Sequence, residues 1–170
     1  MTSEQNNFKI ETERLLLTEF SIDDARPFYD MNNDTEVMKY TGDHPFISVD
    51  EAKKFILQYT AYNEFKMGRW TVRRKSDNAY LGWCGLKLHP DTKEVDLGFR
   101  LIRKYWNKGY ATEAGLSCLE WGKSQNINKI IARCHHENIA SQKVIAKLGF
   151  QFLKSFEENQ NEWYQYQIEF

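Results

Sequence analysis

The sequence lacks the features that mark secreted, membrane-spanning and strongly nucleic-acid-binding proteins. Its 170 residues include three cysteines and no Cys-x-x-Cys pair, which excludes a dense disulfide framework and favours a reducing compartment. No hydrophobic run approaches the roughly 20 apolar residues of a membrane span. The 23 basic residues nearly balance the 24 acidic ones, so overall charge gives no reason to expect nucleic acid or an anionic membrane as a partner.

The segments between the predicted helices and strands are short and varied in composition. No Pro/Gly/Ser-rich linker, low-complexity tract or internal repeat divides the chain, and 41% of its residues are hydrophobic. We therefore expect a single domain over residues 1–170. The N-terminal segment 1–8 is polar and lacks the apolar core of a signal peptide, so the sequence predicts a cytoplasmic protein.

Hydrophobic periodicity predicts strands and helices in α/β order. The predicted strands are 14–20, 69–74, 80–89, 94–102, 129–134, 151–155 and 163–170, and the predicted helices are 23–31, 48–67, 109–123 and 138–148. Ser48 and Glu51 form a capping-box pattern at the start of the second helix. About seven strands and about four helices in this succession predict a mixed, twisted α/β sheet.

The helix predicted to begin at Gly109 opens with small residues. Backbone N–H groups at a helix start have no partner within the helix, and the helix dipole adds partial positive charge, so such a turn can bind phosphate. Gly109 and Ala111 leave the approach open, Lys104 and Lys108 add positive charge, and Thr112 adds a hydroxyl donor. The alternative is an ordinary loop followed by an ordinary helix N-terminus.

Three parts of the chain resemble the GNAT superfamily of N-acetyltransferases, in its ribosomal-protein (RimJ/RimL-like) branch. DLGFRL (96–101) with YWNKGYATEA (105–114) resembles the pyrophosphate-binding motif, ETERLLL (11–17) the opening strand, and NIAS (138–141) with KLGF (147–150) the fourth-helix motif. The sequence departs from the usual pattern at Trp106, where the superfamily usually has Gln or Arg, at Asp96, where Glu is more frequent, and at Thr18, which replaces a frequent Arg.

The resemblance implies the GNAT fold, with a splayed strand pair that forms the acetyl-CoA cleft. It also implies acetyl transfer from acetyl-CoA to a primary amine by direct attack in a ternary complex, without a metal. The pantetheine would pair with an open strand edge at 99–102, where a backbone N–H would stabilise the thioester oxygen. The cofactor-binding residues implied are Phe99, Leu101, Ile102, Lys104, Trp106, Asn107, Lys108, Gly109, Tyr110, Ala111, Thr112, Asn138 and Ser141.

Asp96 is the first candidate for the general base, because it stands where the superfamily often uses a carboxylate. A carboxylate acting through a water can take the proton of an ammonium group and so make the amine nucleophilic. The alternative is a strand-end aspartate paired with an arginine such as Arg100. Glu94 shares the strand face of Asp96 by the period of two and is the substitute base.

Ser141 is the second candidate for a catalytic residue. It lies on the helical face of Val144, Ile145 and Leu148, so its hydroxyl is expected to face the core or the cleft. The resemblance implies that Asn138 and Ser141 contact the cofactor near its sulfur, where the serine could protonate the departing thiolate. The alternative is structural, with Asn138 as a helix N-cap and Ser141 bonded to a backbone carbonyl.

No metal site is expected, since His135 and His136 are adjacent and would point apart in an extended segment. The three cysteines, Cys84, Cys118 and Cys134, lie in predicted strand or helix interiors and are interpreted as packing residues.

Local charge is the only clue from the residues to the acceptor. Residues 21–51 hold eight acidic and two basic residues, whereas residues 100–154 hold ten basic and three acidic ones. A basic half suits a polyanionic cofactor, and an acidic half would steer a cationic amine, unless its carboxylates simply solvate and cap helices. We expect a peptide or protein N-terminal amine, with a small cationic amine (polyamine or aminoglycoside) and a non-catalytic acyl-CoA-binding module as alternatives. Family habit also suggests a homodimer.

Overall fold

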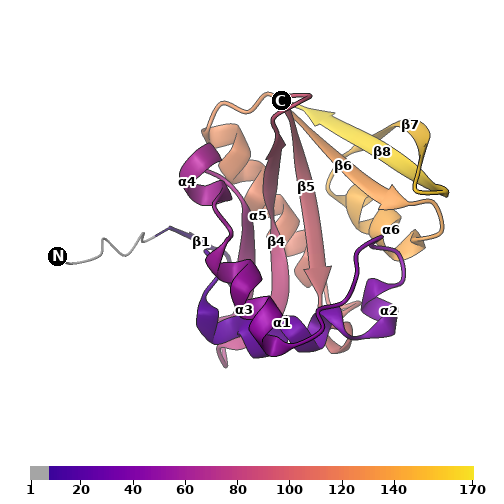
Figure 1. Ribbon diagram of the computed structural model, residues 1–170. Helices are drawn as coiled ribbons and strands as arrows, with labels where there is room; N and C mark the ends of the chain where they lie inside the picture. Colours follow the sequence, from indigo (N-terminus) through magenta and orange to yellow (C-terminus); the bar gives the residue numbers. More distant parts are fainter. Residues whose placement is uncertain (1–7) are drawn as a thin grey trace.

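A computed structural model describes residues 8–170, so most of the polar N-terminal segment, for which no targeting signal is predicted, lies outside the described residues. One eight-stranded sheet runs through the protein in the order β1-β2-β3-β4-β5-β6-β8-β7 (Figure 1). Its strands are β1 (Lys9–Glu11), β2 (Leu15–Thr18), β3 (Arg69–Arg74), β4 (Ala79–His89), β5 (Glu94–Leu101), β6 (Lys129–His135), β7 (Gln151–Glu158) and β8 (Asn161–Glu169). The predicted mixed α/β sheet is confirmed.

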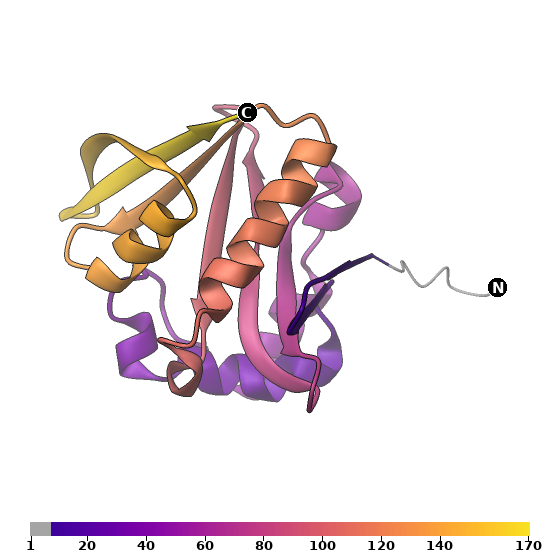
Figure 2. The same cartoon turned by 180° about the vertical axis from the view of Figure 1, so that it is seen from behind.

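Helices cover both faces of this sheet. On the face seen in Figure 1 lie α1 (Ala25–Asn32), α2 (Thr35–Met38), α3 (Val49–Leu57) and α4 (Ala61–Phe65). The opposite face, seen in Figure 2, carries α5 (Tyr110–Ser124), which crosses the central strands, and α6 (Ile139–Lys147) beside it. Two 3-10 turns, Ile22–Asp24 and Arg103–Tyr105, precede α1 and α5. No helix in the stretch 8–170 is long and apolar enough to cross a membrane.

The helix predicted over 48–67 is two helices. Ser48 caps α3 as predicted, with its Oγ accepting from the N–H of Glu51 at 3.1 Å, but the helix ends at Leu57 and a new one begins at Ala61. The break lets Tyr59 and Tyr62 both reach β3: the hydroxyl of Tyr59 accepts from the Arg69 N–H at 2.8 Å, and that of Tyr62 donates to the Arg69 carbonyl. Hydrophobic periodicity alone could not predict the break, because these two hydrogen bonds connect the helices to a strand that follows them in the sequence.

Strands β5 and β6 separate along their length. They are the one parallel pair of the sheet, and their register comprises the single pair Asp96↔Ile131. Figure 1 shows the two strands meeting at one end and diverging toward the other. The expected splayed strand pair is therefore present, with α5 and α6 at its rear and α1 and α2 at its front.

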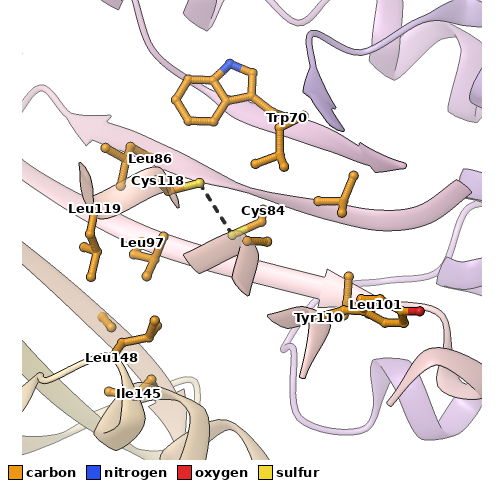
Figure 3. Packing of buried hydrophobic residues seen from close by; sticks show 14 of the residues in the cluster. Trp70, Cys84, Leu86, Leu97, Leu101, Tyr110, Cys118, Leu119, Ile145 and Leu148 are labelled. Atoms are coloured by element: carbon orange, nitrogen blue, oxygen red, sulfur yellow. Dashed lines mark hydrogen bonds between the residues drawn. The ribbon is translucent and has the colours of Figure 1, made fainter. Parts of the chain in front are cut away.

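Small residues let α5 lie close to its neighbours. A Cβ on Gly115 would come within 2.8 Å of the Leu148 side chain, so a larger residue here would require that side chain to move. Cys118 meets Cys84 of β4 with 3.7 Å between the sulfur atoms, in the middle of the main core (Figure 3). All three cysteines are free and buried, as predicted from their positions in the sequence.

Candidate functional site

A cavity of about 1310 Å³ passes through the gap between β5 and β6. Its lining includes the start of α5 and the first turns of α6 on one face of the sheet, and residues of α1, α3, β3 and β4 on the other. The cavity therefore connects the two faces at the place where the sheet opens. This is where most of the site residues expected from the sequence meet.

The first turn of α5 presents open backbone donors to the cavity. The first hydrogen bond of the helix runs from the Glu113 N–H to the Gly109 carbonyl at 3.0 Å. The N–H groups of residues 110–112 therefore donate to no atom among residues 8–170. Gly109 has a φ of 80°, a left-handed conformation that favours glycine, and no side chain blocks the approach there. The geometry suits an anion such as a phosphate.

Arg14 and Glu113 hold this turn in place, a role that the sequence did not suggest. The Arg14 Nη1 donates to the Lys108 carbonyl at 3.0 Å, and its Nε donates to Glu113 at 2.6 Å. Burial raises the pKa of Glu113, but hydrogen bonds from Thr12 and Arg14 outweigh burial and hold that pKa below its usual value. The opening strand is thereby tied to the turn that precedes α5 by charge-assisted hydrogen bonds.

The backbone of β5 has an unpaired edge facing the cavity. The N–H of Ile102 donates to the Leu81 carbonyl of β4 at 2.8 Å, so the alternation of the ladder turns Phe99 and Leu101 away from β4. Their backbone groups face the gap that β6 has left. The Leu101 carbonyl accepts from the Trp106 indole at 2.8 Å. Within residues 8–170, the N–H groups of Phe99 and Leu101 remain as free donors.

Ten of the thirteen residues expected to bind the cofactor line the cavity, and Ile102, Lys104 and Lys108 do not. Ile102 uses its N–H in the ladder with β4. The Lys108 ammonium folds back onto the Lys104 carbonyl at 2.6 Å, and the Lys104 ammonium lies over the Tyr105 ring at 5.0 Å. In this conformation neither lysine extends its charge over the turn.

Asp96 lines the cavity, and its side chain is held by an arginine and a histidine. One carboxylate oxygen accepts from the Arg69 guanidinium at 2.5 Å, and the other bonds the ring Nε2 of His89. Burial raises the pKa of Asp96, but the Arg69 charge and the hydrogen bonds from His89 and Arg69 lower it to about 2. The partner arginine is thus Arg69 and not Arg100, the example suggested by the sequence.

Glu94, the substitute carboxylate, is also paired. Its side chain accepts from the Arg133 guanidinium of β6 at 3.2 Å.

Arg69, the partner of Asp96, also donates to the Gly85 and Asp96 carbonyls, at 2.8 and 3.1 Å. It lies flat over Gly98, where a Cβ would come within 2.8 Å of the guanidinium. The motif glycine at position 98 therefore makes room for Arg69.

Asn138 and Ser141 stand at the start of α6 and line the cavity. The Asn138 side chain accepts from the Ser141 N–H at 3.1 Å, which confirms Asn138 as the N-cap. The Ser141 hydroxyl has no hydrogen-bond partner among residues 8–170, so the backbone-carbonyl bond of the structural alternative is not formed. That hydroxyl is free to meet a ligand.

Four of the eight acidic residues of 21–51 are paired with arginines. The pairs are Asp24–Arg73, Asp30–Arg26, Asp34–Arg103 and Asp43–Arg100. On this face the cavity lining includes Glu36, Asp43 and Asp96 but also Lys39, Arg69, Lys87 and Arg100. Because four cations line this wall beside three carboxylates, the wall carries no net negative charge that could attract a polycation.

Histidines and cysteines contribute no metal-ligating cluster within the described part of the chain. The His135 ring accepts from the Glu137 N–H at 3.1 Å and stacks on Tyr40, with 5.1 Å between ring centroids. Cys134 lines the cavity, and burial raises the pKa of its thiol to about 11. A thiol with this pKa is protonated at neutral pH and is a poor nucleophile.

Comparisons with known proteins identify the family. The model of the acetyltransferase (GNAT) domain matches residues 14–151. The uncharacterized N-acetyltransferase YnaD of Bacillus subtilis is 33% identical over 159 residues, which cover 91% of each chain. A GNAT-family acetyltransferase from Bacillus anthracis has a TM-score of 0.83 at 26% identity, covering 95% of this chain and 98% of that chain. RimL, a ribosomal L7/L12 α-N-protein acetyltransferase solved with coenzyme A, shares the fold at 14% identity, with a TM-score of 0.82 and coverage of 95% and 98%.

Proposed function

The chain belongs to the GNAT acetyltransferase family, and from that premise we propose that it transfers the acetyl group of acetyl-CoA to the N-terminal amine of a peptide or protein. The observation that carries this proposal is the cavity through the splayed strands. It joins a phosphate-binding turn, an open strand edge and a buried carboxylate in one continuous space. Acetyl-CoA supplies a thioester, whose carbonyl carbon is the target of the amine.

The residues that line the cavity suit the parts of such a co-substrate. Amides of residues 110–112 bind the diphosphate at the open start of α5, where Gly109 leaves room. The unpaired edge of β5 binds the pantetheine amides, as one strand pairs with another. The free N–H of Phe99 or Leu101 then lies beside the thioester and stabilises the charge that develops on its oxygen.

Asp96 and Ser141 serve the two proton transfers of the reaction. Asp96 accepts a hydrogen bond from a water that takes the proton of the acceptor's ammonium. Because the pKa of Asp96 is about 2, the carboxylate does not keep this proton at neutral pH and passes it to solvent. The Ser141 hydroxyl, which has no partner among residues 8–170, donates a hydrogen bond to the sulfur as negative charge builds there, and the departing thiolate takes its proton from solvent.

The part of the cavity lining on the α1 and α3 face of the sheet is called the acceptor wall here. Its charge favours a peptide N-terminus over a polyamine. A polyamine carries several positive charges, which would meet Arg69, Lys87 and Arg100 on the same wall. A peptide N-terminus presents one ammonium and therefore meets less repulsion from these cations. The likeness to RimL, which acts on a protein N-terminus, agrees with this choice of acceptor.

An assay of coenzyme A release tests this proposal. The panel contains peptides with a free N-terminus, the same peptides with a blocked N-terminus, spermidine and an aminoglycoside. We expect release with free N-termini and loss of that release when the α-amine is blocked. Release with spermidine or the aminoglycoside alone would contradict the proposed acceptor and leave the acetyltransferase activity standing.

A further inference from the structure

Aromatic side chains gather on the acceptor wall of the cavity. Phe20, Phe46, Phe55, Tyr59 and Trp83 all line it, and we call them the aromatic recess. Four of these rings pack in series, with 4.9 Å between the centroids of Phe20 and Tyr59, 5.9 Å between Phe55 and Tyr59, and 5.8 Å between Phe46 and Phe55. Phe20, Phe46 and Trp83 pack against the buried cluster below α1 and α3.

The rings of the recess are less buried than a core requires. Phe28, directly below them, is 5% exposed and belongs to the core, whereas Phe55 is 42% exposed although it contacts four aromatic rings. Leu57, on the same helix, is 70% exposed but does not line the cavity. An exposed aromatic surface that faces a cavity, and not open solvent, fits an apolar group of a ligand.

Arg69 lies between the aromatic recess and Asp96 and contacts both. Tyr59 accepts from the Arg69 N–H at 2.8 Å, and the guanidinium of Arg69 lies 5.3 Å from the Trp83 ring centroid while it bonds Asp96. An amine held at Asp96 would therefore have a side chain of its own residue within reach of these rings. The polar end of that residue would meet Asp96 and the apolar end would meet the recess.

We propose that the preferred acceptor has an aromatic or large aliphatic side chain on its N-terminal residue, and that this side chain binds in the aromatic recess. The inference rests on the proposed N-terminal acetyltransferase function and specifies its substrate class. Burial of an apolar side chain among rings provides the selectivity, because a serine or aspartate side chain gains nothing there. Phe55, the most exposed ring, contributes to selectivity without being needed for the core.

Steady-state acetylation of matched peptides tests the recess. The peptides differ only in their first residue, which is Phe, Leu, Ser or Asp. We expect kcat/KM to be about 10-fold or more higher for the Phe and Leu peptides than for the Ser peptide, within the range a hydrophobic pocket gives. In Phe55→Ala this preference should shrink several-fold, with the rate for the Ser peptide almost unchanged.

Leu57→Ala is the matched control, because it removes an exposed apolar residue from the same helix outside the cavity. It should keep the wild-type preference, and melting temperatures should show that both variants are folded. Equal rates for all four peptides, or an equal loss for the Phe and Ser peptides in Phe55→Ala, would overturn the recess and leave the proposed function intact. Absence of acetylation with every peptide would overturn the proposed function itself.

Discussion

Replacement of Asp96 by asparagine tests the buried carboxylate in two independent ways. The substitution keeps the shape of the side chain and removes its charge, so the Arg69 guanidinium loses its counter-ion. The pKa of Asp96 falls from 3.8 in a free chain to about 2 in the fold. At about 1.4 kcal/mol for each pKa unit, this shift corresponds to about 2 kcal/mol of stability at neutral pH.

The sign of the pH dependence follows from the direction of that shift. Because the pKa of Asp96 is lower in the folded than in the unfolded state, the ionised carboxylate stabilises the fold above about pH 4. Its contribution disappears as the pH falls through about 2. Urea unfolding at pH 7 should therefore show Asp96→Asn to be less stable than wild type by about 2 kcal/mol, and the difference should narrow in acid.

Asp77→Asn is the control for this measurement. The hydrogen bond from Arg74 lowers the pKa of Asp77 to about 2 as well, but Asp77 lies on the surface, where solvent screens the pair. We expect little change in stability from this variant. If Asp96→Asn were no less stable than Asp77→Asn, the argument that the buried contacts of Asp96 with Arg69 and His89 stabilise the fold would be refuted.

The kinetic consequence of Asp96→Asn is separate from its effect on stability. Turnover per folded molecule should fall roughly 10²-fold at pH 7, as expected when a general base is removed. Much of the loss should be recovered at higher pH, where more of the amine is unprotonated. An unchanged rate would assign proton removal to Glu94 or to water alone.

Three further substitutions test the cofactor side of the cavity. Gly109→Glu should weaken acetyl-CoA binding at least about 10-fold by calorimetry, because its side chain and charge both oppose the diphosphate; unchanged affinity would reject this turn as the diphosphate site. Glu113→Gln, which removes the charge that holds Arg14, should raise the KM for acetyl-CoA more than it lowers kcat; the reverse pattern would argue against a role in positioning the turn. Ser141→Ala should lower turnover while acetyl-CoA affinity and melting temperature stay near wild type; wild-type turnover would refute the acid role.

The open helix start at Gly109 could be predicted from the sequence because its determinants are local. A helix start is encoded by neighbouring residues, and Gly109 and Ala111 lie within five residues of Trp106. The same holds for Asn138, whose role as N-cap depends on residues three positions away. Local patterns also placed most strands and helices to within a few residues, although the one-turn helix α2 and the short strand β1 were missed.

The partners of Asp96 could not be predicted, because they depend on the register of three strands. Arg69 lies on β3 and His89 at the end of β4, and only the pairing of these strands with β5 brings their side chains to one carboxylate. The bond between Arg14 and Glu113 spans 99 residues in the same way. Charges of this kind look like ordinary surface residues in the sequence. The acidic excess of 21–51 likewise gave no sign that three of its carboxylates would pair with arginines elsewhere in the chain.

The most direct test of the account is to locate the acetyl group on a reacted peptide. The substrate is a peptide with a free N-terminal phenylalanine and an internal lysine, incubated with the protein and acetyl-CoA and then sequenced by tandem mass spectrometry. The account predicts a single acetyl group on the α-amine and none on the lysine. An acetyl group on the lysine side chain alone, or no acetylation while spermidine is acetylated under the same conditions, would contradict it.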